Sequence, residues 1–492
     1  MLRGVPGGAR CVTSLIIIPM ALLIRLFVAL SDTRLAVLLA RPAALVPAAA
    51  PARRPWLRAV GWLALLGPFF FLSYGFANWW TDRMPHVGSV VFGWERHIPF
   101  LPWTILPYMS LDAFYAGSLL LCATRAELDT HARRLLAASV ISVAGFLLFP
   151  LQFSFVRPAT SGFNGALFEV LMGFDKPYNQ APSLHISLVI LVWLVFARHL
   201  RGAARWVLHI WFGLIAVSVF TTFQHHFIDG GAGAVVAVVV VYLLPDAPHA
   251  WRPVLAPADA PRRRRLAAIY LLGAALGLAL AAVLGGWAWL LLWPAAASLL
   301  VSLAYGRFGV AVFQKRAGRL SWAAVLLLWP YRVGAWWSSR WLTRHEAPAA
   351  EVVPGLWLGR APGPADHQRL PTAAILDLTA EFGRPAAARH QPYRSVPLLD
   401  LAVPTTGELA AAVAALDELC PCGPVLVHCA LGYSRAAVVV AAWLLHRGRA
   451  ATPEAAVAWV RAVRPQVVLS ARHRAALQAY AAAYCPKPAL TN

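Results

Sequence analysis

Long apolar runs separated by short polar segments occupy the first half of the chain. A helix needs about 20 mostly apolar residues to cross the ~30 Å hydrocarbon core of a bilayer. Six such runs precede residue 245, at roughly 57–78, 103–123, 135–151, 183–197, 206–224 and 230–244. Two more, about 266–284 and 287–305, are separated by two glycines. This pattern predicts a polytopic α-helical membrane bundle with a six-span core, followed by a helical hairpin.

The segments that flank these runs are less regular. The apolar stretch from Leu320 to Trp329 is short and is stopped by Pro330, so we expect an interfacial or re-entrant segment. Residues 1–55 contain one signal-like apolar run and are expected to be signal-like or interfacial. We therefore assign residues 56–245 to the six-span domain. Residues 246–345 would then form a basic linker, the hairpin and the interfacial segment.

After residue 345 the long runs give way to short alternating elements. Strands are expected at 352–358, 373–378 and 425–427, and helices at 408–419, 436–445 and 453–463. Alternating strands and helices indicate an α/β sheet. Residues 346–486 are therefore expected to form a soluble α/β domain behind the membrane part.

Composition supports this division. Hydrophobic residues make up 60% of the chain and charged residues 13%, whereas soluble domains contain roughly 45–50% and 25%. A wholly soluble or disordered protein is thus excluded. There are 30 basic and 11 acidic residues before Glu346, against 13 and 10 from it onward. A basic, apolar region of this kind is typical of membrane proteins, so membrane lipids and not nucleic acid are the expected partners. The oligomeric state is not fixed by the sequence.

Basic loops set the expected orientation. Arginines precede the first apolar run and follow the second, fourth and sixth runs, and the positive-inside rule places these loops in the cytoplasm. The C-terminal domain should then lie on the cytoplasmic side of an inner (plasma) membrane. The six cysteines stand at positions 11, 122, 420, 422, 429 and 485. They form no plausible disulfide framework for so long a chain, which fits a reducing compartment.

A strand, a tight loop and a helix surround Cys429. Loop amides at the start of a helix bind anions, because unpaired N–H groups and the helix dipole both favour negative charge. A phosphate fits there, and the same field favours a thiolate nucleophile at Cys429. Arg435 can hold two phosphate oxygens with its planar guanidinium group. The other candidate phosphate-binding residues of the loop are His428, Gly432 and Ser434.

His428, Cys429 and Arg435 match the signature His-Cys-x5-Arg. On these residues the domain resembles the protein-tyrosine and dual-specificity phosphatase family over about 140 residues. The resemblance implies cofactor-free hydrolysis of phosphomonoesters through a phosphocysteine, with Asp400 as the acid that protonates the leaving oxygen. The chain departs from the family at Ala436, where a Ser or Thr commonly helps the thiolate leave, which puts the rate of that second step in doubt.

The loop itself bears on the substrate. Apart from Arg435 it adds no positive charge that could pair with a polyphosphorylated group. Phosphorylated Tyr, Ser or Thr of a protein, or a singly phosphorylated lipid, are therefore the expected substrates.

Polar groups also gather at one end of the predicted six-span unit. Arg157 follows the third run, His185 opens the fourth, and His225 and Asp229 lie between the fifth and the sixth. The orientation derived from the arginines places all of them on the outer face. A histidine held by a carboxylate can attack phosphorus, a second histidine can protonate the leaving alkoxide, and an arginine can stabilise the transition state. A spacing of four puts His225 and Asp229 on one helical face. This chemistry requires no metal.

These groups resemble, in order, the motifs Lys-x6-Arg-Pro, Pro-Ser-x-His and Ser-Arg-x5-His-x3-Asp of the type-2 phosphatidic acid phosphatase superfamily. The resemblance implies that His225 is the nucleophile, oriented by Asp229, and that His185 is the acid. Arg157 would bind the phosphate. His226 is expected to be a spectator and His209 a hydrogen-bonded helix residue, and neither is expected to be catalytic.

Two cations of those motifs are absent. Pro150 stands at the lysine position and Val219 at the arginine position of the third motif. These gaps look more like the inositol-phosphorylceramide-synthase branch, whose members transfer a phosphorylated headgroup between lipids. The sequence therefore predicts a bifunctional integral-membrane phosphatase and leaves three alternatives open: an outer site that is a transferase, an outer site that is an inactive anchor, or a C-terminal domain that only binds phosphorylated partners.

Overall fold

The structure is a computed structural model that describes residues 54–246 and 260–485. The chain divides into two compact units, 1–248 and 249–492. The signal-like run expected near the N-terminus lies outside the described residues. What can be described is a helical N-terminal unit and a C-terminal unit that combines apolar helices with an α/β fold.

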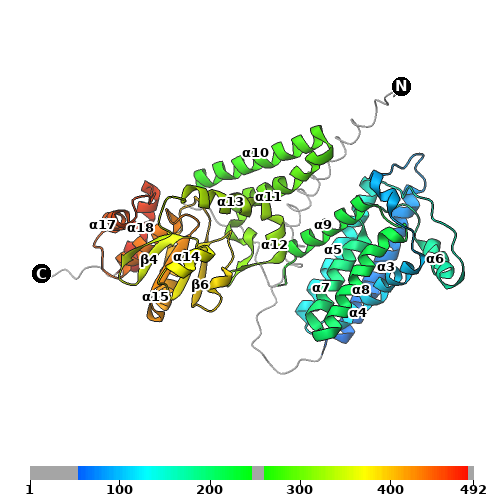
Figure 1. The fold of residues 1–492 in the computed structure, drawn as a ribbon, viewed down its shortest axis with the longest axis horizontal. Helices are drawn as coiled ribbons and strands as arrows, with labels where there is room; N and C mark the ends of the chain where they lie inside the picture. Colours follow the sequence, from blue (N-terminus) through cyan, green and yellow to red (C-terminus); the bar gives the residue numbers. More distant parts are fainter. Residues whose placement is uncertain (1–53, 247–259, 486–492) are drawn as a thin grey trace. The chain divides into compact units, whose positions relative to one another are not determined.

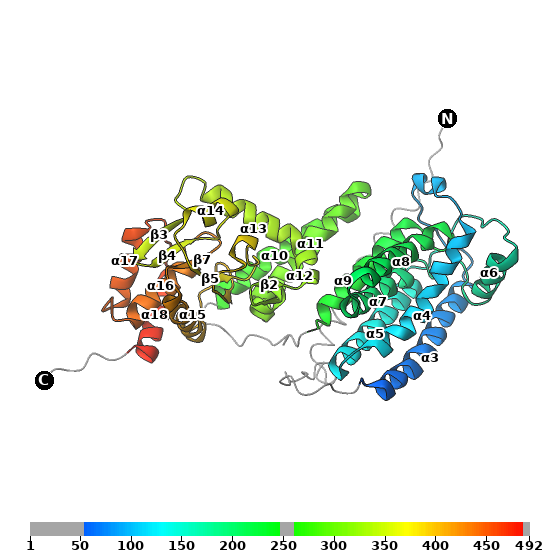
Figure 2. The ribbon, with the colours of Figure 1, turned by 60° about the horizontal axis from the view of Figure 1, so that its bottom comes forward.

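The first unit is a helical bundle. Its helices are α3 (Trp56–Thr81), α4 (Ile105–Leu121), α5 (Arg125–Leu148), α6 (Gly162–Phe174), α7 (Leu184–His199), α8 (Gly202–Thr221) and α9 (Phe227–Leu243). Figures 1 and 2 show all of them except α6 lying side by side, while α6 lies at one edge and packs on the bundle through the buried side chain of Phe168. Each of the six predicted apolar runs forms one helix of the bundle, and α6 was not predicted.

Five stretches among the described residues are long and apolar enough to cross a membrane. Three are α3, α5 and α8, and the other two, Ala260–Leu284 and Gly286–Phe313, belong to the second unit. Helices α4, α7 and α9 have 17, 16 and 17 residues. A helix rises about 1.5 Å per residue, so these three are a few ångströms shorter than a typical span.

Ion pairs join helix ends at one end of the bundle. Arg58 of α3 lies 2.6 Å from Asp129 of α5, and Arg134 of α5 lies 2.9 Å from Asp246 beyond α9. Helix α5 begins well before the predicted apolar run, because the Thr124 hydroxyl accepts a hydrogen bond from a backbone N–H of the first turn. The arginines that indicated the cytoplasmic side thus pair with acidic residues of neighbouring helices.

The second unit opens with the predicted hairpin. Its elements are α10 (Ala260–Leu284), η3 (Gly286–Leu291), α11 (Leu292–Leu303), η4 (Ala304–Phe308) and η5 (Gly309–Phe313). Gly285 and Gly286 have φ angles of 61° and 52°, a left-handed conformation that favours glycine, so the turn falls where the two glycines predicted it.

A short two-stranded sheet and two helices follow the hairpin. These are β1 (Lys315–Arg316), β2 (Arg319–Leu320), α12 (Trp322–Leu327) and α13 (Trp329–Leu342). The predicted interfacial segment was expected to stop at Pro330. The helix that it forms, α12, ends at Leu327, and Pro330 lies in the first turn of the next helix, α13, where the missing N–H costs nothing.

The remaining residues form a five-stranded sheet in the order β3-β4-β7-β5-β6. Its strands are β3 (Ala349–Val353), β4 (Leu356–Arg360), β5 (Ala374–Thr379), β6 (Tyr393–Leu398) and β7 (Val425–Cys429), and its helices are α14 (Pro364–Arg369), α15 (Thr406–Leu419), α16 (Arg435–His446), α17 (Pro453–Val463) and α18 (Ala471–Tyr484). All strand pairs are parallel except β3 with β4. Figure 2 shows α15, α16 and α18 on one side of the sheet and α13 and α14 on the other.

Two details differ from the sequence prediction. The single strand expected at 352–358 is a hairpin of β3 and β4, because Pro354 and Gly355 turn the chain and Gly355 has φ 81°. Strand β6 and helix α18 were not predicted. The central strand β7 is fully buried and ends at Cys429, so this residue emerges at the carboxyl edge in the middle of the sheet.

Candidate active sites

The loop between β7 and α16 closes over the thiol of Cys429. The Cys429 Sγ accepts a hydrogen bond from the backbone N–H of Gly432 at 3.2 Å. Gly432 has φ +77°, and a Cβ added there would lie 2.6 Å from the carbonyl carbon of Gly359. Glycine is therefore required for the chain to turn back toward the sulfur so closely to β4.

Arg435 is held by carboxylates on two sides. Its Nη1 and Nη2 donate to the two carboxylate oxygens of Glu381 at 3.0 and 2.7 Å, and Nη2 lies 3.0 Å from Oδ1 of Asp400. Burial opposes the charged form of Arg435, but both carboxylates outweigh it and raise the pKa of Arg435 well above its usual value. Likewise burial opposes ionisation of Glu381, and Arg435 lowers the pKa of that carboxyl overall. The guanidinium is thus a fixed positive charge beside the loop.

Asp400 lies beside the guanidinium group of Arg435. It follows β6, its side chain is 34% exposed, and it contacts Arg435 across the mouth of the site. The structure therefore brings Asp400, Arg435 and Cys429 together, as the sequence predicted. Glu381 was missed, since a lone glutamate after a buried strand matches no motif.

His428 lies on the opposite side of β7 among buried polar groups. Its Nε2 is 3.9 Å from Oδ1 of Asp377, and neither ring nitrogen has a hydrogen-bond partner. Burial lowers the pKa of His428, so the ring is neutral near pH 7. Asp377 in turn accepts from Lys315 at 2.6 Å and from Tyr393 at 2.5 Å. Burial opposes ionisation of Asp377, but the charge of Lys315 and the hydrogen bonds from Lys315 and Tyr393 lower its pKa to about 2.

Ser434 takes part in a hydrogen-bond chain that leads away from the thiol. Its Oγ is 3.1 Å from Nε2 of His473 on α18, and the other ring nitrogen of His473 is 2.8 Å from Oγ of Ser470. Ala436 is fully buried in the core below the loop. His473 was not singled out by the sequence, because the contact joins two segments that no local pattern connects.

The candidate membrane site lies in the first unit, at the N-terminal ends of α7 and α9. Nδ1 of His225 is 3.9 Å from Oδ2 of Asp229, which is beyond hydrogen-bond distance. That carboxylate accepts instead from the backbone N–H of His226 at 2.8 Å. Nδ1 of His225 and Nε2 of His185 are buried without hydrogen-bond partners. Two imidazoles with unpaired nitrogens therefore lie where the motifs predicted them.

Arg157 approaches the same end of the bundle. Its Nε and Nη2 donate to the carbonyl oxygens of Thr222 and Phe223, both at 3.1 Å. Val219, at the motif position where an arginine is expected, is fully buried in an apolar cluster with Ile105 and Ile186. No cation can replace it there without disrupting that cluster, so Arg157 is the positive group available to a phosphate among the motif residues.

Tyrosines complete the surroundings of His185. The Tyr108 ring stacks on the imidazole with 4.1 Å between centroids and 12° between planes. The hydroxyls of Tyr74 and Tyr108 donate to the carboxylate of Asp175 at 2.6 and 3.4 Å. These groups had no predicted role. The available signal was Asp175 itself, since an ionisable residue beside an apolar helix is often functional.

His226 has a different environment. Its Nδ1 is 3.0 Å from a carboxylate oxygen of Glu95, its Nε2 is 3.0 Å from Oγ of Ser154, and its ring stacks on Phe153. Both nitrogens are engaged in these contacts, which fits the expectation that His226 is a spectator.

Two family models match the chain. Residues 356–483 match the dual specificity phosphatase catalytic domain, and residues 100–243 match the PAP2 superfamily. The chain carries both domains. It is a phosphoric monoester hydrolase, as the resemblances implied. No curated protein matches the chain significantly.

Solved structures match the dual-specificity phosphatase domain. Tk-PTP in its active form is 20% identical, with a TM-score of 0.26, over 28% of this chain and 97% of that one. Human DUSP28 is 25% identical, with a TM-score of 0.24, over 28% and 95%. PTPMT1 in complex with PI(5)P is 20% identical, with a TM-score of 0.25, over 28% and 96%.

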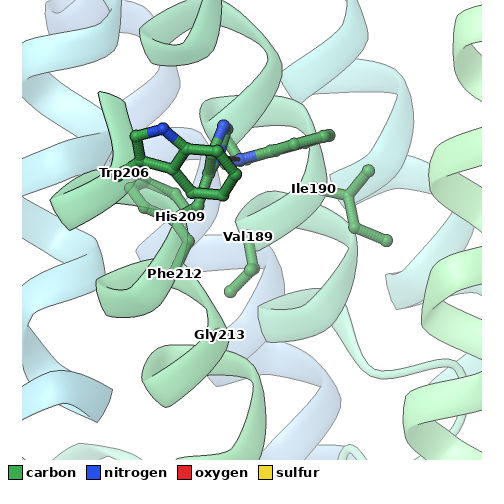
Figure 3. A pocket seen from close by; sticks show the side chains of 7 residues that line it. Val189, Ile190, Trp206, His209, Phe212 and Gly213 are labelled. Carbon is green, nitrogen blue, oxygen red and sulfur yellow. Dashed lines mark hydrogen bonds between the residues drawn. The ribbon is translucent and has the colours of Figure 1, made fainter. Parts of the chain in front are cut away.

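The PAP2-superfamily domain also has a hollow that is separate from its motif residues. Figure 3 shows this hollow of about 420 Å³ between α7 and α8, lined by Val189, Ile190, Trp193, Trp206, His209, Phe212 and Gly213. Trp193 Nε1 lies 2.9 Å from one ring nitrogen of His209 and Arg205 Nε lies 3.3 Å from the other. Both partners are donors and a neutral imidazole accepts at one nitrogen, so His209 accepts from one of them at a time. The expectation that His209 is a hydrogen-bonded helix residue is confirmed, and the hollow offers no reactive group.

Proposed function

We propose that the protein is a bifunctional integral-membrane phosphatase, and that its dual-specificity phosphatase domain hydrolyses phosphomonoesters at Cys429. The observation that carries this proposal is the convergence of Cys429, Arg435 and Asp400 from three different elements. A domain that only binds phosphate has no use for a nucleophile and an acid together.

The proposed reaction has two steps. The Cys429 thiolate attacks phosphorus, the bond from phosphorus to the leaving oxygen breaks, and the Asp400 carboxyl gives that oxygen its proton. A water then attacks the phosphocysteine, gives a proton to the Asp400 carboxylate, and displaces the thiolate with release of inorganic phosphate. Arg435 stabilises the charge on the phosphoryl oxygens in both steps.

The carboxylates around Arg435 link the binding of a phosphate to the protonation of Asp400. Without substrate, Nη2 of Arg435 is shared between Glu381 and Asp400. A phosphate dianion on Arg435 competes with Asp400 for this nitrogen and places negative charge beside the aspartate, which favours the protonated carboxyl that the first step needs. Glu381 is more buried and keeps the guanidinium in place throughout.

We propose a second site in the PAP2-superfamily domain. His225 would attack a lipid phosphate to form a phosphohistidine, and His185 would protonate the leaving alkoxide. The buried, unpaired ring nitrogens support this role. The acceptor in the second step is water for a phosphatase and a second lipid hydroxyl for a transferase. The apolar burial of Val219 favours the transferase or inactive alternatives, because it leaves fewer cations for a free phosphate.

The two sites would face opposite sides of the membrane. If the six bundle helices all span, the ion-paired end of the bundle is cytoplasmic and the two histidines are outside. The phosphatase domain would then act on cytoplasmic phosphoproteins or lipid monophosphates, and the PAP2-superfamily domain on lipids of the outer leaflet.

The test is phosphate release by the purified full-length protein in detergent, from a phosphotyrosine peptide and from lipid monophosphates. We expect Cys429→Ser to abolish one set of activities and His225→Ala another. Asp400→Asn should slow turnover without loss of phosphopeptide binding. Unchanged phosphate release by Cys429→Ser would contradict the proposed cysteine chemistry. Unchanged phosphate release by His225→Ala would contradict the proposed histidine chemistry and leave the first unit with the role of a membrane anchor.

A further inference from the structure

The apolar hairpin packs directly against the acid loop of the phosphatase domain. The Tyr305 hydroxyl, in η4, donates to the backbone carbonyl of Asp400 at 2.9 Å. The ring of Tyr270, in α10, stacks on Tyr305 with 5.7 Å between centroids, and Tyr331 of α13 meets Tyr270 edge-on at 6.0 Å. The loop that holds the proposed acid is thus fixed by side chains from a candidate membrane span.

A second contact fixes the neighbouring part of the sheet. Lys315, in the short hairpin after η5, is buried with its Nζ 2.6 Å from Asp377 and 2.7 Å from the carbonyl oxygen of Thr379. Arg332 of α13 donates to the carbonyl of Glu381, the residue that holds Arg435, at 2.9 Å. The hairpin segment is therefore an integral part of the catalytic unit, and a flexible tether would need none of these contacts.

A cavity of about 240 Å³ with a mainly apolar lining lies between the hairpin and the acid loop. Its apolar lining includes Phe308, Val310, Leu398 and Val403, and its polar lining includes Arg263 and Glu408. Leu398 also supplies the carbonyl that Arg435 contacts at 3.1 Å, so the cavity adjoins the phosphate site. Its cation, Arg263, is buried, with its guanidinium on the carbonyls of Ala304 and Tyr305.

The outer surface of this segment has the character of a membrane face. Apolar side chains of α10 are exposed, among them Leu272 at 70% and Val283 at 80%. Helix α13 exposes large apolar side chains at Trp329, Val333, Trp336, Trp337 and Trp341. Tryptophan is enriched where proteins cross from the bilayer core to the headgroups. These features put the cavity next to the bilayer surface.

From these contacts we infer that the substrate of the Cys429 site is a phosphorylated lipid that remains in the bilayer. Its phosphate enters the Cys429 loop, and its apolar part lies against the cavity between η5 and the acid loop. This inference rests on the proposed cysteine chemistry and names its substrate class. A phosphopeptide would gain nothing from an apolar cavity built from a membrane hairpin, so it is the competing outcome of the test.

The experiment uses the full-length His225→Ala protein in mixed micelles, so that the PAP2-superfamily site does not contribute. Phosphatidic acid and a phosphatidylinositol monophosphate are supplied in dioleoyl and in water-soluble dibutanoyl form, beside a phosphotyrosine peptide. We expect kcat/KM to be at least about tenfold higher for a dioleoyl lipid than for its dibutanoyl form, since burying about two methylene groups suffices for that factor. Equal rates for both chain lengths, or a faster phosphopeptide, would overturn the inference.

A pair of variants locates the effect. Val310→Asp puts a carboxylate into the cavity and should lower the ratio of dioleoyl-lipid to phosphopeptide kcat/KM about tenfold. Ala482→Asp adds the same group to the exposed end of α18 and should keep the wild-type ratio. A ratio unchanged by Val310→Asp would contradict the cavity's role. Two failures can be told apart. If Cys429→Ser still released phosphate from every substrate, the proposed cysteine chemistry would be wrong. If only the preference for the long-chain lipid were absent, the proposed substrate class would be wrong. The chain-length comparison is made in the His225→Ala protein itself, so it tests the inference even if Val310→Asp does not fold.

Discussion

Replacing Glu381 with glutamine tests whether the orientation of Arg435 limits catalysis. Glu381 is 2% exposed and accepts two hydrogen bonds from the Arg435 guanidinium, one on each carboxylate oxygen. Glutamine has nearly the same shape but offers one acceptor, and its NH2 group would face an N–H of the guanidinium. The arginine must then turn away or lose one contact.

The expected size follows from those two bonds. Hydrogen bonds to charged groups contribute about 1.5–3 kcal/mol each. Losing one of these bonds and the carboxylate charge should weaken the orientation of the Arg435 guanidinium toward the phosphoryl oxygens. The expected loss of transition-state stabilisation is about 2–4 kcal/mol. This corresponds to a fall in kcat/KM of roughly 30- to 1000-fold. Asp400 remains as a partner of Arg435, so the charge is not left unpaired.

The assay is steady-state hydrolysis by the full-length protein, with thermal unfolding measured in parallel. Glu418→Gln is the matched control, because Glu418 pairs with Arg394 at the surface, where such a pair contributes at most about 1 kcal/mol. Glu381→Asp, which keeps the charge, should recover part of the activity. If Glu381→Gln hydrolysed substrate within threefold of the wild-type rate while folded, Glu381 would not position Arg435.

Four further outcomes are expected. Lys315→Met leaves the buried carboxylate of Asp377 without its cation and should lower the free energy of unfolding of the C-terminal unit by about 3–5 kcal/mol. Denaturant or thermal unfolding measures this change. A decrease below about 1 kcal/mol would show that the contact between Lys315 and Asp377 is not formed. Because the pKa of folded Asp377 is lowered to about 2, its stabilisation is complete above the unfolded value near 4 and is lost as the pH falls toward 2, a decline that Asp377→Asn should lack. Ala436→Ser should speed release of the thiolate, so stopped-flow traces should show a smaller burst and a faster steady state than wild type; identical traces would mean that the second step is not slow. Tyr108→Ala removes the ring stacked on His185 and should lower the His225-dependent turnover of lipid phosphates about tenfold. The Cys429-dependent turnover of the same protein is the internal control. An unchanged His225-dependent rate would exclude a role for the stacked ring.

The cysteine site could be predicted from sequence because its chemistry is local. Cys429 and Arg435 stand within one strand–loop–helix unit, and Asp400 was assigned through a family resemblance. Glu381 and His473 could not be found this way. Each reaches the loop through the packing of a separate element, and a single glutamate or histidine in an α/β domain has many other roles.

The hairpin shows a similar limit. Its helices and its glycine turn follow from apolar runs and two adjacent glycines, so they were predicted correctly. That Tyr305 would meet the Asp400 loop, or that Lys315 would be buried against Asp377, depends on tertiary packing that periodicity does not encode. The apolar stretch before Pro330 ends with α12 as expected, but the new helix α13 was not predicted, because a proline that stops one helix is also compatible with the first turn of the next.

The proposed cysteine chemistry is tested most directly by trapping its intermediate. Full-length protein is mixed with a phosphotyrosine peptide or a lipid monophosphate, quenched in denaturant within one turnover, digested and analysed by mass spectrometry. We expect one phosphoryl group on the peptide that contains Cys429, and none on the corresponding peptide of Cys429→Ser. The phosphocysteine should accumulate because Ala436 lacks the hydroxyl that would help the thiolate leave. Rapid substrate turnover without any phosphoryl group on Cys429 would contradict the proposed mechanism.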